Sequence, residues 1–132
     1  MTWKQAKSYA ESLGGHLVTI SDETENTFVA DLARSKGVVS DSWIGLTDEV
    51  REGTFTWVTG EPLNYKKWNP GQPDDWGGNE DYVAMGQFDK YTWNDTSGND
   101  PLPFVVEFEG TSPTLTPTPT PIITTTPTPT TA

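Results

Sequence analysis

The sequence contains no cysteine among its 132 residues. Disulfide bonds, zinc sites built from thiolates and catalytic thiols are therefore excluded. A lack of cysteine is usual in reducing compartments, but surface proteins of many prokaryotes lack it as well. The absence therefore excludes certain chemistry without deciding the compartment.

Basic residues are also scarce. Eight Lys and Arg stand against 19 Asp and Glu, which gives a net charge of −11 with the one histidine neutral. This charge repels nucleic acid and anionic membranes, so neither is expected as a partner, and cations are the natural counterpart. No apolar run approaches membrane-spanning length, so no membrane insertion is expected.

Recognisable catalytic motifs are missing. There is no Gly-x-Ser-x-Gly, no His-Glu-x-x-His and no phosphate-binding loop. The lone His16 follows Gly15 at the end of a predicted helix, where a structural role is expected. The sequence therefore predicts a protein that is not an enzyme.

The C-terminal part carries no charge after Glu109 and is almost entirely Thr and Pro from Pro113 onward. Such a segment buries too little apolar surface to offset its ordering entropy. We expect one folded domain over residues 1–110 and a disordered Thr/Pro-rich linker over 111–132. The linker favours an extracellular or cell-surface location. Because "MTWKQ" is not a signal peptide, we expect a fragment of a longer, secreted or surface-anchored protein with further domains.

The folded part begins with two helical patterns. Thr2 and Gln5 form a capping box before the first, and Ser21 is the expected cap of the second, which ends before Gly37. Alternating patterns follow, with turn residues between them. The expected strands are 16–20, 42–46, 54–58, 82–86, 91–93 and 104–108. Helices followed by a run of strands favour the α+β class.

The stretch "PGQPDDWGGNED", residues 70–81, gathers acidic side chains with amides and glycines. Further acids lie in "TDEVREG" and "WND". Such carboxylates can form a solvated acidic face, a general acid and base pair as in glycosidases, or a site for a hard cation. Calcium takes six to eight oxygen ligands, which favours a calcium site assembled from separated segments, since no EF-hand loop is present.

These segments resemble the C-type lectin domain. The resemblance runs over residues 2–109 and is carried by "WIGLTDEVREGTFTWVTG", a Gln-Pro-Asp triplet, a Trp-Asn-Asp triplet and "FVVEFE", in this order. It implies two helices flanking two small antiparallel sheets, with a long loop that binds calcium and sugar. The usual first strand of the family is absent, which would leave an open edge beside the last strand.

The resemblance implies two calcium sites. The principal site would use Gln72, Asp74, Glu80, Asn94 and Asp95. The auxiliary site would use Asp48, Glu52, Asp75, Asp81 and the backbone carbonyl of Glu80. A cis peptide bond at Pro73 would aim the side chains that flank it at the principal ion.

The resemblance also implies a sugar whose hydroxyls complete the coordination of the principal ion. Gln-Pro-Asp is similar to the motif of galactose binders, in which a tryptophan after the motif stacks on the sugar. Trp76 has that place here. The implied sugar contacts are Gln72, Asp74, Trp76, Glu80, Asn94 and Asp95.

The sequence departs from the family in one respect. The two disulfides of the family are missing, and the resemblance places their positions at Ala10 with Val106 and at Tyr82 with Gly98. The leading function is a calcium-dependent carbohydrate-binding module of the galactose or N-acetylgalactosamine type. The alternative is an adhesion domain of the same fold that binds protein or another surface, in which calcium only orders the loop.

Overall fold

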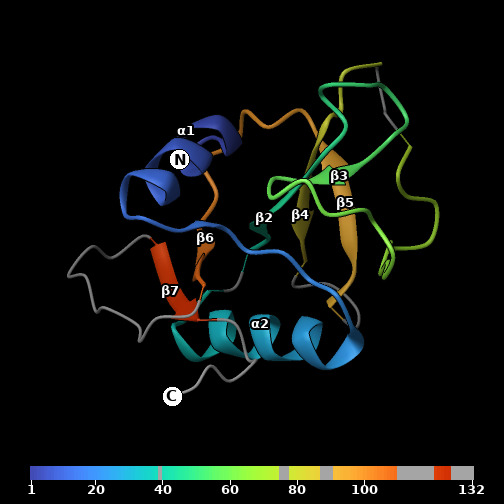
Figure 1. Cartoon of the computed structure of the whole chain (residues 1–132). Helices are drawn as coiled ribbons and strands as arrows, with labels where there is room; N and C mark the ends of the chain where they lie inside the picture. The colour runs from blue at the N-terminus through green and yellow to red at the C-terminus, as the bar shows by residue number, and fades with distance from the viewer. Residues whose placement is uncertain (39, 75–77, 87–90, 110–120, 126–132) are drawn as a thin grey trace.

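The structure, a computed structural model, describes residues 1–38, 40–74, 78–86, 91–109 and 121–125, the last as backbone only. Its helices and strands are, in chain order, α1 (Trp3–Ser12), β1 (His16–Leu17), α2 (Glu23–Ser35), β2 (Ser42–Thr47), β3 (Thr56–Trp57), β4 (Tyr82–Met85), β5 (Trp93–Thr96), β6 (Phe104–Phe108) and β7 (Pro121–Thr125). Two helices lie on either side of the strands (Figure 1), so the predicted α+β class is confirmed.

The two helices begin in different ways. At α1, Thr2 Oγ1 accepts from the Gln5 amide (3.3 Å) and Gln5 Oε1 accepts from the Thr2 amide (3.0 Å), which confirms the predicted capping box. At α2 the cap is Asp22, whose carboxylate accepts from Glu25 N at 2.8 Å. The predicted cap Ser21 instead donates its hydroxyl to Glu25 Oε1 at 2.9 Å. The prediction was one residue early because Asp22, directly after Ser21, caps equally well.

The strands form one mixed sheet in the order β1-β6-β2-β4-β5, with β3 paired to β2 and β7 paired to β6. The β2–β6 and β6–β7 pairs are parallel, and the others are antiparallel. We expected two separate antiparallel sheets. The hydrogen bonds instead join all strands, because β6 pairs along both of its edges.

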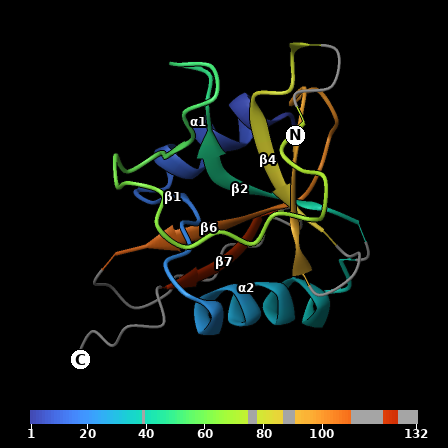
Figure 2. The same ribbon diagram turned by 90° about the vertical axis from the view of Figure 1, so that its right-hand side faces the viewer.

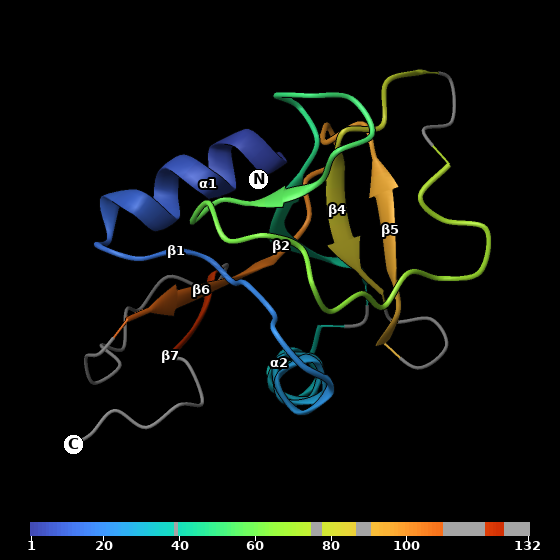
Figure 3. The ribbon, with the colours of Figure 1, turned by 45° about the vertical axis from the view of Figure 1, so that its right-hand side comes forward.

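The sheet carries an apolar cluster on each face. One cluster lies against α1, and its largest members, fully buried, are Trp3, Leu17, Trp43 and Phe104. The other lies against α2 and includes Val29, Ile44, Leu46, Val83 and Trp93. Figure 3 shows the two helices on opposite sides of the strands. The tryptophans Trp43, Trp57 and Trp93 are all buried in these clusters.

The C-terminal segment differs from expectation at one place. Residues 121–125 form β7 beside β6, whereas we expected disorder from residue 111 onward. Four of the five residues of Pro-Ile-Ile-Thr-Thr are β-branched, which suits a strand. The Thr/Pro repeats around this short segment hide that signal. In the described part of the chain no helix has both the length and the apolar character to cross a membrane.

Candidate functional site

The predicted ligands gather at one end of the sheet. Strands β4 and β5 pair antiparallel, with Tyr82 opposite Thr96 and Val83 opposite Asp95. Residues 80–81 directly precede β4, and Asp95 lies near the end of β5. The pairing therefore brings acids that are distant in the sequence to the same end of the sheet.

The first group of acids, here called the principal cluster, consists of Asp74, Glu80 and Asp95. One carboxylate oxygen from each lies within 4.8 Å of those of the other two. Asp95 is only 2% exposed, whereas Asp74 is exposed to solvent. The Asp74 amide donates to Asp95 Oδ1 at 3.1 Å, which fixes the loop against the strand.

Gln72 completes this arrangement. One terminal atom of its amide lies 2.6 Å from Asp95 Oδ1 and 3.3 Å from Asp74 Oδ1. Without an ion the amide donates its NH₂ group to these carboxylates, and with a cation between them it would offer its oxygen instead. The Gln72–Pro73 bond is cis, as predicted. Four predicted principal ligands thus meet, while the fifth, Asn94, precedes Asp95 on β5 and its contact stays a prediction.

The second group, here called the auxiliary cluster, consists of Asp48, Glu52 and Asp81, whose carboxylate oxygens also lie within 4.8 Å of one another. Asp48 is 2% exposed, and its Oδ2 accepts from Gly53 N at 2.8 Å. Within the described part of the chain its Oδ1 is buried with no hydrogen-bond partner. A buried carboxylate oxygen in this state fits a cation ligand. The predicted ligand Asp75 lies outside the described residues.

The two clusters share the dipeptide Glu80–Asp81, because each cluster takes one of its side chains. The Asp81 carbonyl accepts from Thr47 Oγ1 (2.6 Å) and from Asp48 N (3.1 Å), which ties it to the end of β2. A cation in either cluster would therefore restrain the segment that supplies the other. Trp76, the predicted sugar-stacking residue, lies outside the described residues.

An aromatic group supports the loop before Gln72. The ring of Trp93 is 0% exposed and meets three other rings edge-on, at centroid distances of 5.6 to 5.8 Å. These rings belong to Trp57, Tyr65 and Trp68. On the backbone, Trp93 N donates to Lys67 O and Asn69 N donates to Trp93 O, both at 2.8 Å. The loop is therefore fastened to β5, and the partly buried Trp68 packs against the apolar cluster that contains Trp93.

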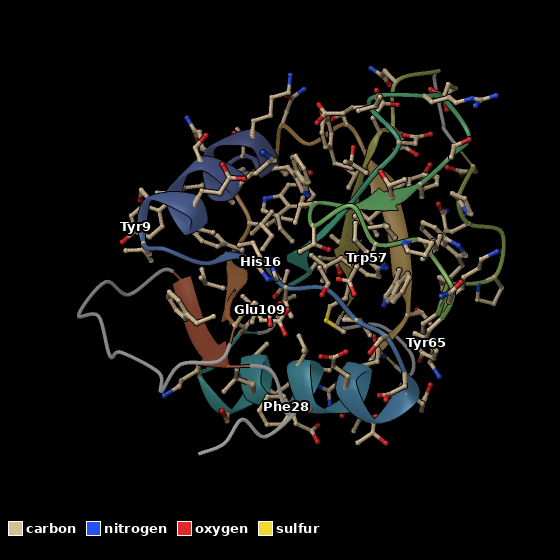
Figure 4. The ribbon with its side chains drawn as sticks, viewed as in Figure 1. Tyr9, His16, Phe28, Trp57, Tyr65 and Glu109 are labelled. Carbon is tan, nitrogen blue, oxygen red and sulfur yellow. The ribbon has the colours of Figure 1, made fainter. Side chains whose placement is uncertain are left out.

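Sequence reasoning missed a third polar group on the opposite part of the sheet. Glu107 is 1% exposed and accepts from Thr19 N at 3.1 Å. Burial raises the pKa of Glu107 to about 7, although the Thr19 hydrogen bond and His16 act in the opposite direction. His16 Nε2 lies 3.2 Å from Glu109 Oε1, and Figure 4 shows these two side chains close together. The sequence signal that could have identified Glu107 is its place among the apolar residues of "FVVEF".

Together the fold and the site define an α+β binding domain whose loops gather carboxylates at one end of a sheet. The chain belongs to the C-type lectin domain family, since the family profile described as "Lectin C-type domain" matches residues 1–108. Members of this family are generally binding modules and not enzymes.

Known proteins of several kinds are similar to the chain. The low affinity immunoglobulin epsilon Fc receptor of Mus musculus is 42% identical over 96 residues, which are 70% of this chain and 26% of the receptor. The cow C-type carbohydrate-recognition domain of CD23, solved in the presence of GlcNAc2Man3 oligosaccharide, is 38% identical with a TM-score of 0.67, covering 74% of this chain and 71% of that chain. A calcium-independent type II antifreeze protein is 28% identical with a TM-score of 0.66, at the same coverage of 74% and 71%.

Proposed function

We propose that the protein is a calcium-dependent carbohydrate-binding module of the galactose or N-acetylgalactosamine type. The observation that carries this proposal is the principal cluster. There a loop and a strand supply carboxylate oxygens to one point, and the side-chain amide of Gln72 faces the carboxylates of Asp74 and Asp95. Carboxylate and amide oxygens are the ligands that calcium prefers. The exposure of Asp74 leaves a side open for a further ligand.

The residues that would hold the ions follow from the clusters. Calcium in the principal cluster would be held by Gln72, Asp74, Glu80, Asn94 and Asp95. A second ion would be held by Asp48, Glu52, Asp75, Asp81 and the Glu80 carbonyl. A bound ion supplies positive charge that attracts the lone pairs of two neighbouring sugar hydroxyls. The carboxylates around it then accept hydrogen bonds from the sugar hydroxyls, and the side-chain amides donate hydrogen bonds to them.

Specificity would come from the order of these groups. An amide at position 72 and an acid at position 74 place a donor and an acceptor on defined sides of the sugar. This order is the galactose type, and Trp76 would stack on the apolar face of the sugar. Stacking of this kind adds on the order of 1 kcal/mol.

Glycan binding with and without chelator tests the proposal. We expect binding in millimolar calcium, loss of binding in chelator, and competition by galactose in preference to mannose. Asp95→Asn should abolish binding because it removes a charged ligand. Asp100→Asn, which changes an exposed acid outside both clusters, is the matched control and should bind like the unchanged chain. Glycan binding that persists in chelator would refute the proposal.

The alternative function is an adhesion domain that binds protein or another surface. The similarity to a solved structure described as a calcium-independent type II antifreeze protein supports this second class. An array with no glycan hit, together with calcium-induced stabilisation of the fold, would select it. In either case we propose an extracellular location, which the Thr/Pro-rich linker favours. We also propose further domains in a longer protein, because the chain spans about a quarter of the mouse receptor.

A further inference from the structure

A third group of possible metal ligands, here called the histidine cluster, consists of His16, Glu107 and Glu109. The antiparallel pairing of β1 with β6 places His16 opposite Glu107. Glu109 directly follows β6 and lies two residues beyond Glu107, on the same face of the strand. One ligand atom from each residue lies within 4.8 Å of those of the other two. Figure 2 shows β1 and β6 between the two helices.

The ring of His16 is held so that one nitrogen faces the two glutamates. Its Nδ1 lies 2.7 Å from the carbonyl oxygen of Leu17, which can only accept, so Nδ1 carries a proton. In the neutral ring Nε2 then carries a lone pair. Nε2 lies 3.2 Å from Glu109 Oε1 and 3.9 Å from Glu107 Oε1. A hydrogen bond from Nδ1 to a backbone carbonyl also orients the histidines that bind metals through Nε2.

The carboxylate of Glu107 is held as firmly. It is 1% exposed, and its Oε1 accepts from Thr19 N at 3.1 Å and lies 3.3 Å from Thr19 Oγ1. Among the described residues, His16 is the only basic partner within ion-pair distance of either glutamate. Two carboxylates therefore share one imidazole, and the group as a whole suits a positive ion.

We propose that the histidine cluster is a zinc site, in which His16 Nε2 and one oxygen each from Glu107 and Glu109 bind the ion. Bonds of about 2.0–2.2 Å in a tetrahedron place ligands roughly 3.3–3.6 Å apart, between the two distances from Nε2. Three protein ligands leave the fourth position to water. Calcium takes oxygen ligands, so the imidazole nitrogen separates this site from the two carboxylate clusters.

The histidine cluster contains the only histidine of the chain, so NMR of the imidazole nitrogens reports on this site alone. Zinc chloride is added to the full chain with calcium in excess, which competes for the two carboxylate clusters. We expect the Nε2 resonance to move until one equivalent of zinc is bound, while Nδ1 keeps its proton. A histidine spectrum that stays unchanged at several equivalents of zinc overturns the proposal.

Calorimetric titration under the same conditions compares three variants. Removing even an outer partner of a metal ligand costs about tenfold in affinity, so His16→Gln and Glu109→Gln should each weaken zinc binding at least tenfold. The Glu109 side chain is 61% exposed, so its replacement leaves the core intact. Glu11→Gln, an exposed acid of α1, is the matched control and should bind zinc like the unchanged chain. Equal affinity in all four proteins would place zinc on the acidic surface at large and overturn the proposal.

Discussion

At the scale of single residues, two buried carboxylates carry the case for a cation. Asp95 and Asp48 are each 2% exposed, although each belongs to a group of three acids. Burying a carboxylate is costly unless it is hydrogen-bonded, paired or bound to a metal. Each accepts a backbone hydrogen bond, from Asp74 and Gly53 respectively. The buried Asp48 Oδ1, which has no such partner in the described part of the chain, is left for a cation.

The identity of residues 72 and 74 should set the sugar preference. The double exchange Gln72→Glu with Asp74→Asn swaps donor and acceptor around the principal cluster and keeps the same number of oxygen ligands. We therefore expect calcium affinity to stay within a few-fold, while the ratio of mannose to galactose competition rises about tenfold, which corresponds to about 1.4 kcal/mol. Competition assays and calcium titration measure the two quantities separately. Unchanged preference with intact calcium binding would contradict the role of this pair.

Glu107 should make stability depend on pH. Its folded-state pKa of about 7 lies above the ordinary value of 4.5, because burial penalises the charged form. The folded chain therefore holds this proton more tightly than the unfolded chain. This contribution to stability is complete below about pH 4.5 and is lost as the pH rises to about 7.

Glu107→Gln should therefore gain stability relative to the unchanged chain across this pH range, by on the order of 3 kcal/mol at pH 8. A glutamine oxygen can still accept from Thr19 N. Chemical denaturation at a series of pH values measures the effect. Glu11→Gln, on the exposed face of α1, serves as the control and should show no such trend. A constant difference between Glu107→Gln and the unchanged chain at all pH values would contradict the prediction.

At the scale of elements, side-chain packing takes the place of the two disulfides of the family. Ala10 of α1 and Val106 of β6 are both 0% exposed and belong to the same apolar cluster. Tyr82 lies so close to Gly98 that a Cβ atom there would fall 2.4 Å from its ring. Its ring also packs on Trp3 at a centroid distance of 4.7 Å. The positions implied by the resemblance are therefore neighbours here, held by apolar and aromatic contacts.

Ala10→Cys with Val106→Cys should restore one of these bridges. The bond would close a loop of about a hundred residues, for which chain entropy gives roughly 4–5 kcal/mol, reduced by any strain. We expect the oxidised variant to be about 2–4 kcal/mol more stable than its reduced form in denaturant titrations. The reduced form is the matched control. A failure to oxidise, or equal stability of both forms, would show that α1 and β6 are not placed as described.

The accuracy of prediction also differs between elements. Helix α1 was predictable because a capping box is a local signal, whereas the gathering of the acids was predicted through the family resemblance that the Gln-Pro-Asp and Trp-Asn-Asp triplets carry. The joining of all strands into one sheet was not, since it depends on β6 pairing with β1, β2 and β7, which are far apart in the sequence. Strand β7 was missed because its β-branched run is short and lies among prolines. Glu107 was missed because its surroundings come from Thr19 and His16, about ninety residues earlier.

At the scale of the whole molecule, the carboxylate clusters and β7 lie at different ends. Figure 3 shows the long loop beyond β5 on one side and β7 with β6 on the other. Thr125, the end of β7, therefore lies away from the proposed sugar site. This polarity would let a module on a stalk present its binding loop outward.

Because the net charge of the chain is −11, calcium should stabilise the folded protein as a whole. Calcium that binds only the folded chain should stabilise it by RT ln(1 + [L]/Kd). Extracellular modules bind calcium with Kd values around 10⁻⁴–10⁻³ M, so 10 mM calcium should contribute about 1.4–2.7 kcal/mol per site. For a domain of this size, that is a rise in Tm of roughly 5–20 °C.

General screening of the negative charge would also raise Tm, so sodium chloride at equal ionic strength is the control. If the carboxylate clusters hold calcium, calcium chloride should raise Tm well above the value in sodium chloride. Asp48→Asn and Asp95→Asn should each lower the calcium-dependent part of the rise, because the two clusters share residues 80–81 and support each other. The same melting curve in calcium and in sodium chloride would mean that the acids form only a solvated face, and the sugar site built on them would fall with it.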